Sequence, residues 1–492
     1  MNRMTLLDCR WVVPVGLLVP GAACAHSFAP PYTLPVPFSL YAGGAAAALV
    51  LSFVVVGVFV GVPSLGAASA ASAVVAGAVP RAGRLLRAAR VLSLMLLALC
   101  IACGLLGSAN PYANFNMTFF WIVFVLGVPY LVAIVGDFYA AVNPWRVLIG
   151  AIESLRQNAF AGRVSYSVRL GYWPALLLYM AFIWLELFAR MQPRGLAFAL
   201  LAYTAINLIG AWLIGTRDWF RYGEFFAVFL RLIGRMSIWA RPWGPEQAAH
   251  AGRGPRFRAP FVGLLEQRAD HLSLVLFVLF MLSSTAFDGL HATLPWVSVF
   301  WKGIYPSIAP LFSPAPGQQY ALSTQLYYVW QWLSMLASPL IYLLVFVAFV
   351  AVARWAARSA LTLHGLVLRF GLLLVPIAFV YHVTHYYTLL LAQGGQIVRL
   401  ASDPMGLGWN LFGTSTWVIE PLMIDVEAIW HTQIALILLG HIVSVYLAHI
   451  EALQTFETPR RAAASQLPML VLMVMFTTLG LWILSLPLSA SS

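Results

Sequence analysis

Two apolar stretches decide the fold of this chain: residues 365–391, GLVLRFGLLLVPIAFVYHVTHYYTLLL, and residues 430–451, WHTQIALILLGHIVSVYLAHIE. Each is long enough to cross the hydrocarbon core of a bilayer as a helix, which takes about 20 residues. The segment 392–429 between them is polar and rich in glycine. The pattern predicts two neighbouring transmembrane helices joined by a hairpin outside the membrane.

The composition of the whole chain agrees with this reading. Of its 492 residues, 62% are hydrophobic and 9% are charged, whereas soluble domains carry about 25% charged residues. The mean hydropathy is +0.86. We therefore predict an all-α fold, a polytopic transmembrane helix bundle of about ten spans. The expected spans are 39–62, 91–108, 117–135, 173–191, 195–215, 271–287, 329–353, 365–391, 430–451 and 467–488.

The arginines gather in alternate loops, as the positive-inside rule requires. The two long inner loops, about 136–172 and 216–270, hold many of them, and the outer hairpins, about 288–328 and 392–429, hold few. This distribution places both mature termini outside the cell membrane. It also accounts for the net charge of +12, so we expect the bilayer as partner and no nucleic acid.

Residues 1–25 have the pattern of a cleaved signal peptide, with basic Arg3 and Arg10 before an apolar core. Ala23 and Ala25 frame a small-residue cleavage site, which leaves 26–492 as a single integral-membrane domain. Cleavage there makes His26 the mature N-terminus. Its amine and ring could together bind a metal, typically copper, or His26 could simply follow the cleaved bond.

Two segments of the inner loops have amphipathic patterns. Residues 136–160 contain a turn at Asn143-Pro144 before a helical pattern, and residues 220–243 place Phe, Leu and Ile on one helix face and Arg on the other. Both are typical of helices lying on the inner membrane surface, although solvated loop helices would show the same pattern. For Asp137 and Asn143 we expect turn and capping roles.

The ionisable residues within the spans concentrate on the outer side. Asp288 and His291 are three residues apart, as are His382 and His385, while Glu427 and His431 are four apart, so each pair shares a helix face. If spans 365–391 and 430–451 pack antiparallel, His382 and His441 fall at similar depth. Imidazole and carboxylate groups on facing helices form metal sites in helix bundles. The candidate ligands are His26, His291, His382, His385, His431 and His441.

Other readings of these residues remain open. A single histidine within a span is usually a hydrogen-bonded packing residue, and several could form a proton or ion pathway. Glu186 and Arg190 have the i,i+4 spacing of a self-neutralising pair, and Cys100 and Cys103 resemble buried apolar residues. The sequence contains no P-loop, GxSxG or HExxH motif.

Extended motifs resemble the bacterial membrane proteins named fenitrothion hydrolase. These are residues 382–414, HVTHYYTLLLAQGGQIVRLASDPMGLGWNLFGT, and 430–456, WHTQIALILLGHIVSVYLAHIEALQTF. The segments 136–148, GDFYAAVNPWRVL, and 285–296, TAFDGLHATLPW, fit as well, and so does the leader ending in AHSF. The resemblance runs over most of the chain.

The resemblance implies an enzyme of the bacterial inner membrane that hydrolyses organophosphorus triesters, with a second, homologous membrane subunit. It implies no catalytic residues, so the site is assigned from the residues themselves. We expect a divalent transition metal (Zn, Cu or Fe) at the histidines, with Asp288 or Glu427 as the proton acceptor and a lipophilic small-molecule substrate. The alternatives are a copper- or iron-binding redox or metal-handling protein and a transporter that uses the histidines as a proton relay.

Overall fold

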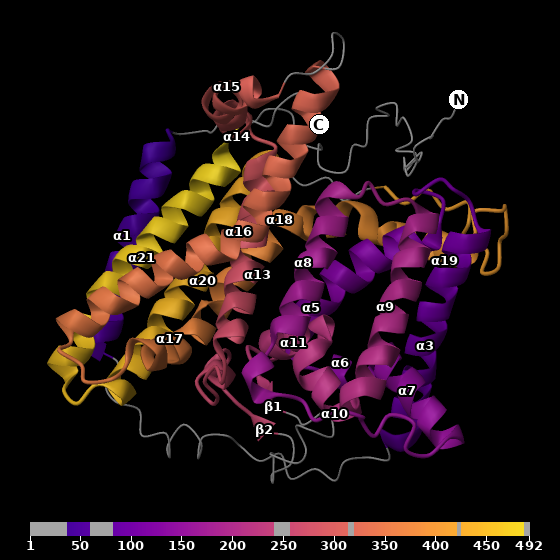
Figure 1. Cartoon of the computed structure of the whole chain (residues 1–492), viewed down its shortest axis with the longest axis horizontal. Coiled ribbons are helices and arrows are strands. Elements are labelled where there is room, and N and C mark those ends of the chain that lie inside the picture. The colour runs from indigo at the N-terminus through magenta and orange to yellow at the C-terminus, as the bar shows by residue number, and fades with distance from the viewer. Residues whose placement is uncertain (1–36, 60–81, 241–255, 313–318, 421–424, 487–492) are drawn as a thin grey trace, which may run out of the picture.

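The computed structural model describes residues 37–59, 82–240, 256–312, 319–420 and 425–486. This part of the chain is almost entirely helical (Figure 1), with ten helical runs long and apolar enough to cross a membrane. The prediction of an all-α polytopic bundle with about ten spans is therefore confirmed. The expected signal peptide and His26 lie outside the described residues.

The first half of the chain contains mostly short and medium helices. Their bounds are α1 (Phe38–Phe59), α3 (Ala82–Leu106), α4 (Phe115–Met117), the π-helix η1 (Thr118–Gly127), α5 (Val128–Val135), α6 (Tyr139–Val142), α7 (Pro144–Leu155), η2 (Val168–Leu170), α8 (Trp173–Phe188), α9 (Pro193–Ile214), α10 (Thr216–Asp218), the π-helix η3 (Trp219–Gly223) and α11 (Phe225–Gly234). Two short antiparallel strands follow, β1 (Trp239–Ala240) and β2 (Arg256–Phe257).

The second half contains the longest helices. Their bounds are η4 (Val262–Leu264), α13 (Leu272–His291), α14 (Leu294–Ser298), η5 (Val299–Ile304), α15 (Tyr305–Ile308), η6 (Ala309–Leu311), α16 (Gln319–Ala356), α17 (Leu363–Gly371), η7 (Leu372–Leu374), α18 (Val375–Gln393), η8 (Gly394–Gln396), α19 (Ile397–Ser402), α20 (Val426–Thr455) and α21 (Pro459–Ser485).

Several helices begin earlier than the apolar pattern predicts. Helix α3 begins at Ala82, so Arg84, Arg87 and Arg90 belong to the helix rather than to the preceding loop. All three side chains are exposed. Long basic side chains can run along a helix end and place their charge at the membrane surface, so the helix extends past its apolar core.

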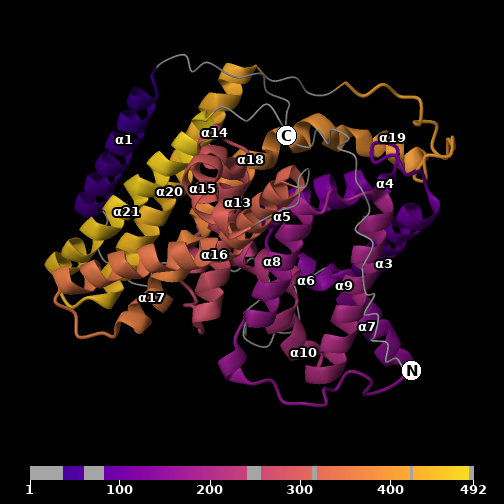
Figure 2. The same ribbon diagram turned by 45° about the horizontal axis from the view of Figure 1, so that its top comes forward.

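Helices α13 and α18 hold the two halves of the molecule together. Figures 1 and 2 show α1, α16, α20 and α21 on one side and α3 to α11 on the other, with α13 and α18 between them. Helix α13 contacts α8, α16 and α18. It is also the most enclosed span, with 83% of its apolar window buried against 11% for α1.

The sequence of α13 explains its central place. LSLVLFVLFMLSSTAF is apolar on every face, which is typical of a helix surrounded by other helices. His271 caps its N-terminus by accepting a hydrogen bond from the Ser273 amide. Ser283 bonds the Ser338 hydroxyl of α16 at 2.8 Å, while the hydroxyls of Ser284 and Thr285 donate to the Met281 carbonyl of their own helix, so these buried polar side chains are satisfied.

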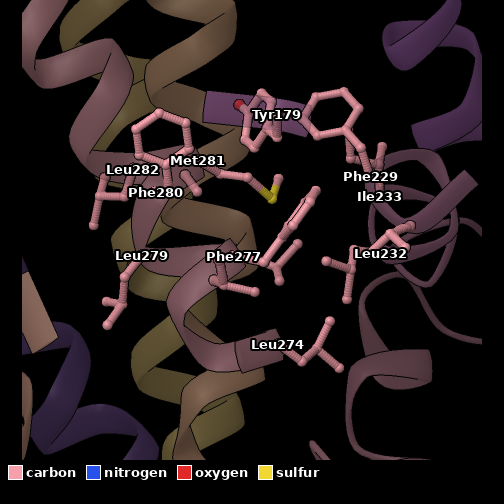
Figure 3. Close-up of a cluster of buried hydrophobic side chains, with 14 of the residues drawn as sticks. Tyr179, Phe229, Leu232, Ile233, Leu274, Phe277, Leu279, Phe280, Met281 and Leu282 are labelled. Carbon is pink, nitrogen blue, oxygen red and sulfur yellow. The ribbon is translucent and has the colours of Figure 1, made fainter. Parts of the chain in front are cut away.

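Helix α11 corrects one prediction, because it is packed inside the bundle rather than on the membrane surface. All of its residues except Ala227 and Arg231 are buried. Figure 3 shows its residue Phe229 near Tyr179 of α8 and Phe277 of α13, and the Tyr179 ring lies 5.8 Å from Phe229. The Arg231 guanidinium donates to the carbonyls of Phe220 and Arg221. Arg231 is therefore bonded within the chain and does not form the basic face of a surface helix.

A buried carboxylate fixes the N-terminus of α11. Glu224 has no exposed surface and accepts hydrogen bonds from the amides of Phe226 (3.1 Å) and Ala227 (2.8 Å). It also accepts from Asn143 Nδ2 at 3.0 Å and from the Tyr203 hydroxyl. Burial raises the pKa of this carboxyl above its usual range, although these donors oppose the shift.

Asn143 performs the capping role that the sequence predicts. Its Oδ1 accepts from the amides of Trp145 (3.0 Å) and Arg146 (3.1 Å) at the start of α7. Because its Nδ2 reaches Glu224, one side-chain pair caps α7 and α11 together.

We predict that Glu224→Ala lowers the apparent melting temperature of the purified protein more than Glu224→Gln does. Alanine removes the cap and leaves four buried donors without an acceptor, a loss of at least about 2 kcal/mol. Glutamine keeps one acceptor oxygen. Thermal unfolding in detergent measures the difference, with Glu153→Ala of α7 as a control. Equal losses for the two Glu224 variants would show that the carboxyl oxygens do not hold these helices.

Candidate functional site: a carboxylate pocket between helices α8, α11, α13 and α18

Asp288, near the end of α13, is the centre of the candidate site. Its side chain is buried, and its Oδ2 accepts a hydrogen bond from the Tyr386 hydroxyl at 2.7 Å. His385 Nε2 lies 2.8 Å from the same oxygen. Both partners are consecutive residues of α18, so one carboxylate oxygen joins the two central helices. A carboxylate held by two donors keeps a fixed orientation.

His291 lies one turn beyond Asp288 on the same helix. Its Nδ1 is 2.8 Å from the Asp288 main-chain oxygen and 3.8 Å from Oδ1 of the side chain. The imidazole stacks on the Phe287 ring with centroids 5.5 Å apart. The predicted pairing of Asp288 and His291 on one helix face is therefore present, although the closer contact is to the backbone.

A pocket opens beside Asp288, with about 560 Å³ of empty space including its mouth. Its polar lining consists of Glu186, Ser284, Thr285, Asp288 and His382 together with two tyrosine rings. The aromatic lining is Phe124, Tyr179, Phe182, Phe225, Phe226, Phe229 and Tyr386. Helix α11 supplies three of these rings, so its burial is what closes this side of the pocket.

Glu186 of α8 belongs to the pocket, whereas the sequence predicts that it pairs with Arg190. Its carboxyl lines the pocket and is close enough to Asp288 and the Tyr386 hydroxyl to interact electrostatically with both. No ion pair joins it to Arg190, so the predicted self-neutralising pair is wrong. Helix α8 ends at Phe188 and Arg190 has a φ of 43°, which breaks the helical spacing on which that prediction depended.

His382 also faces the pocket, one turn before Tyr386 on α18. Its ring centroid lies 5.0 Å from that of Tyr386, 6.1 Å from that of Tyr130 and 6.3 Å from that of Phe229. Its Nε2 is buried and has no hydrogen-bond partner in the described part of the chain. An imidazole nitrogen in this state needs a partner from a bound molecule or water.

The structure places the remaining predicted residues outside the pocket. His441 is buried, with Nδ1 2.9 Å from the Ile437 carbonyl, and its ring lies 6.1 Å from that of Tyr381. It thus sits at the expected depth, but against Tyr381 rather than His382. Successive residues of a helix point about 100° apart, so the neighbour of a pocket residue faces away. His431 and Glu427, near the start of α20, are exposed.

The predicted metal ligands do not converge on one point. Among the residues that the structure describes, no three His, Cys, Asp or Glu side chains are arranged to hold a metal ion. His385 Nε2 already faces Asp288, and His441 lies on another face. These donor atoms do not fit the expected metal centre, so the divalent metal stays a prediction. The reaction proposed for this site uses protein groups alone.

Comparison with protein-family models, with curated proteins and with solved structures finds no match for this chain. The resemblance to fenitrothion hydrolases therefore stays a prediction, and the argument for function depends on the pocket.

We predict that the Asp288–His385 pair is coupled by more than about 1 kcal/mol, because both groups are shielded from water. A double-mutant cycle of Asp288→Asn and His385→Gln, read from the apparent stability of each protein, measures this coupling. Exposed His431→Ala should change stability by no more than about 0.5 kcal/mol. Additive effects of the two site variants would contradict the pairing.

Proposed function

We propose that this chain is an integral-membrane hydrolase that cleaves a lipophilic organophosphorus triester in the pocket beside Asp288. The observation that carries the proposal is the Asp288 carboxylate, held by His385 and Tyr386 at the wall of an aromatic cavity. The resemblance to fenitrothion hydrolases supplies the reaction class.

In this proposal Asp288 is the general base. It accepts a proton from a water molecule whose oxygen attacks phosphorus, while the bond from phosphorus to the aryl oxygen breaks and the phenolate leaves. The donors Tyr386 and His385 keep the carboxylate oriented. A general base acts only when it is held within hydrogen-bond reach of the proton that it takes, so these partners matter as much as Asp288 itself.

The pocket suits an aromatic substrate. Its rings offer stacking surfaces for an aryl leaving group. A lipophilic triester would concentrate in the bilayer and reach the pocket from there.

A second candidate is a proton pathway, because titratable groups lie next to one another beside the pocket. Glu186, Tyr386, Asp288 and His385 form this series. Ionisable residues within a membrane often form such relays in pumps and transporters. A transporter would then use the pocket for its cargo.

The cellular setting also belongs to the proposal. We place the protein in the bacterial inner membrane, with both mature termini and the end of α13 that carries Asp288 facing outside, since the arginine-rich loops lie at the opposite end. A homologous membrane subunit would be its partner.

We predict that Asp288→Asn lowers the turnover of a nitrophenyl dialkyl phosphotriester by at least about 100-fold, the usual contribution of a general base. Release of nitrophenolate from reconstituted protein measures it. Glu427→Gln, at an exposed carboxylate, is the matched control and should keep wild-type turnover. Activity that survives in Asp288→Asn would contradict the assignment.

The two candidate functions differ in what the wild-type protein does in proteoliposomes. Hydrolysis predicts nitrophenolate release with no proton flux across the bilayer. A pH-sensitive dye enclosed in the vesicles reports any flux. Proton movement that depends on Asp288, without hydrolysis, would favour the relay.

A further inference from the structure

The pocket contains a carboxyl group that hydrolysis does not use. Among the described residues, its lining includes two carboxyl groups, those of Glu186 and Asp288, and no lysine or arginine. Asp288 has His385 as a cationic partner at 2.8 Å when that imidazole is protonated. Glu186 has no ion pair with a basic side chain in the described ranges. A carboxyl group within a membrane protein that has no basic partner is costly to ionise and usually has a functional role.

The walls of the pocket have the chemistry that recognises organic cations. Seven aromatic residues line the pocket together with the carboxyl groups, and the faces of aromatic rings attract cations because of their negative electrostatic potential. Phe225, Phe226 and Phe229 of α11 and Phe182 of α8 belong to this wall. Aromatic cages of this kind bind ammonium groups in proteins.

We propose that this pocket is a binding site for a lipophilic organic ammonium ion, with its charged nitrogen next to Glu186 and its apolar substituents against the aromatic wall. The proposal goes beyond hydrolysis and does not depend on it. A bare inorganic cation is a poor fit, because hard cations take about six or more oxygen ligands and the carboxyl oxygens here are too few for the space.

His382 provides an independent indication of a ligand. Its buried Nε2 lines the same pocket and has no partner among the described residues. A neutral imidazole nitrogen can accept a hydrogen bond, which the N–H group of a protonated amine would donate. Glu186 and His382 therefore offer two acceptors for the N–H groups of a protonated amine, in addition to the aromatic wall that would also hold a quaternary ammonium ion.

The test compares two probes of the same shape. Phenyltrimethylammonium carries a permanent charge, and tert-butylbenzene is its neutral isostere. We expect the cation to bind purified wild-type protein in nanodiscs at least about tenfold more tightly, the effect of a desolvated cation–π contact. Glu186→Gln should remove this preference, while binding of tert-butylbenzene persists and shows that the pocket is folded.

A matched control separates this site from general attraction to acidic side chains. Glu427→Gln removes an exposed carboxylate and should leave the preference unchanged. Equal affinity of the two probes for wild-type protein would overturn the proposal, and so would a preference that survives in Glu186→Gln. Displacement of the probe by sodium ions alone would also overturn it. Since no turnover is measured, loss of the hydrolase proposal would not affect the result.

If both proposals hold, phenyltrimethylammonium should inhibit phosphotriester turnover competitively. Inhibition without competition would separate the cation site from the substrate site and contradict a shared pocket.

Discussion

The contact between Asp288 and the pair His385–Tyr386 is the interaction on which the rest of the structure depends. It joins α13, the most enclosed span, to α18, and these two helices separate the halves of the bundle. A carboxylate inside a membrane protein is stable only with strong partners. The same two contacts therefore join the two central helices and orient a reactive group beside the pocket.

The pocket exists because α11 enters the bundle. Its three phenylalanines form one wall, and its position depends on the buried Glu224, which accepts from two amides of α11 and from Asn143 at the start of α7. Two carboxylates thus have different tasks. Glu224 has four donors and is structural, whereas Glu186 has no basic partner in the part of the chain that the structure describes and lines the pocket.

Much of the fold could be predicted from the sequence, because transmembrane helices depend on length and hydropathy alone. The ten spans follow from these two properties, and the capping role of Asn143 follows from its place directly before a helix.

The burial of helix α11 could not be predicted. In the sequence Arg231 belongs to a basic helix face, but in the structure its guanidinium bonds the carbonyls of Phe220 and Arg221. His441 shows a second limit of prediction from the sequence. The depth of a residue in the membrane follows from its position along the helix, but the direction of its side chain depends on how the helix is rotated about its axis. The place of Glu186 in the pocket could not be predicted either. The sequence pairs Glu186 with Arg190 at helical spacing, but α8 ends at Phe188, before Arg190.

A structure of the protein determined with a non-hydrolysable phosphotriester analogue tests the central claim most directly. We predict that the analogue lies between α8, α11, α13 and α18, with its phosphorus next to Asp288 and its aryl group against the phenylalanines of α11. An analogue bound instead beside His431 and Glu427, or at any position away from Asp288, would contradict this account.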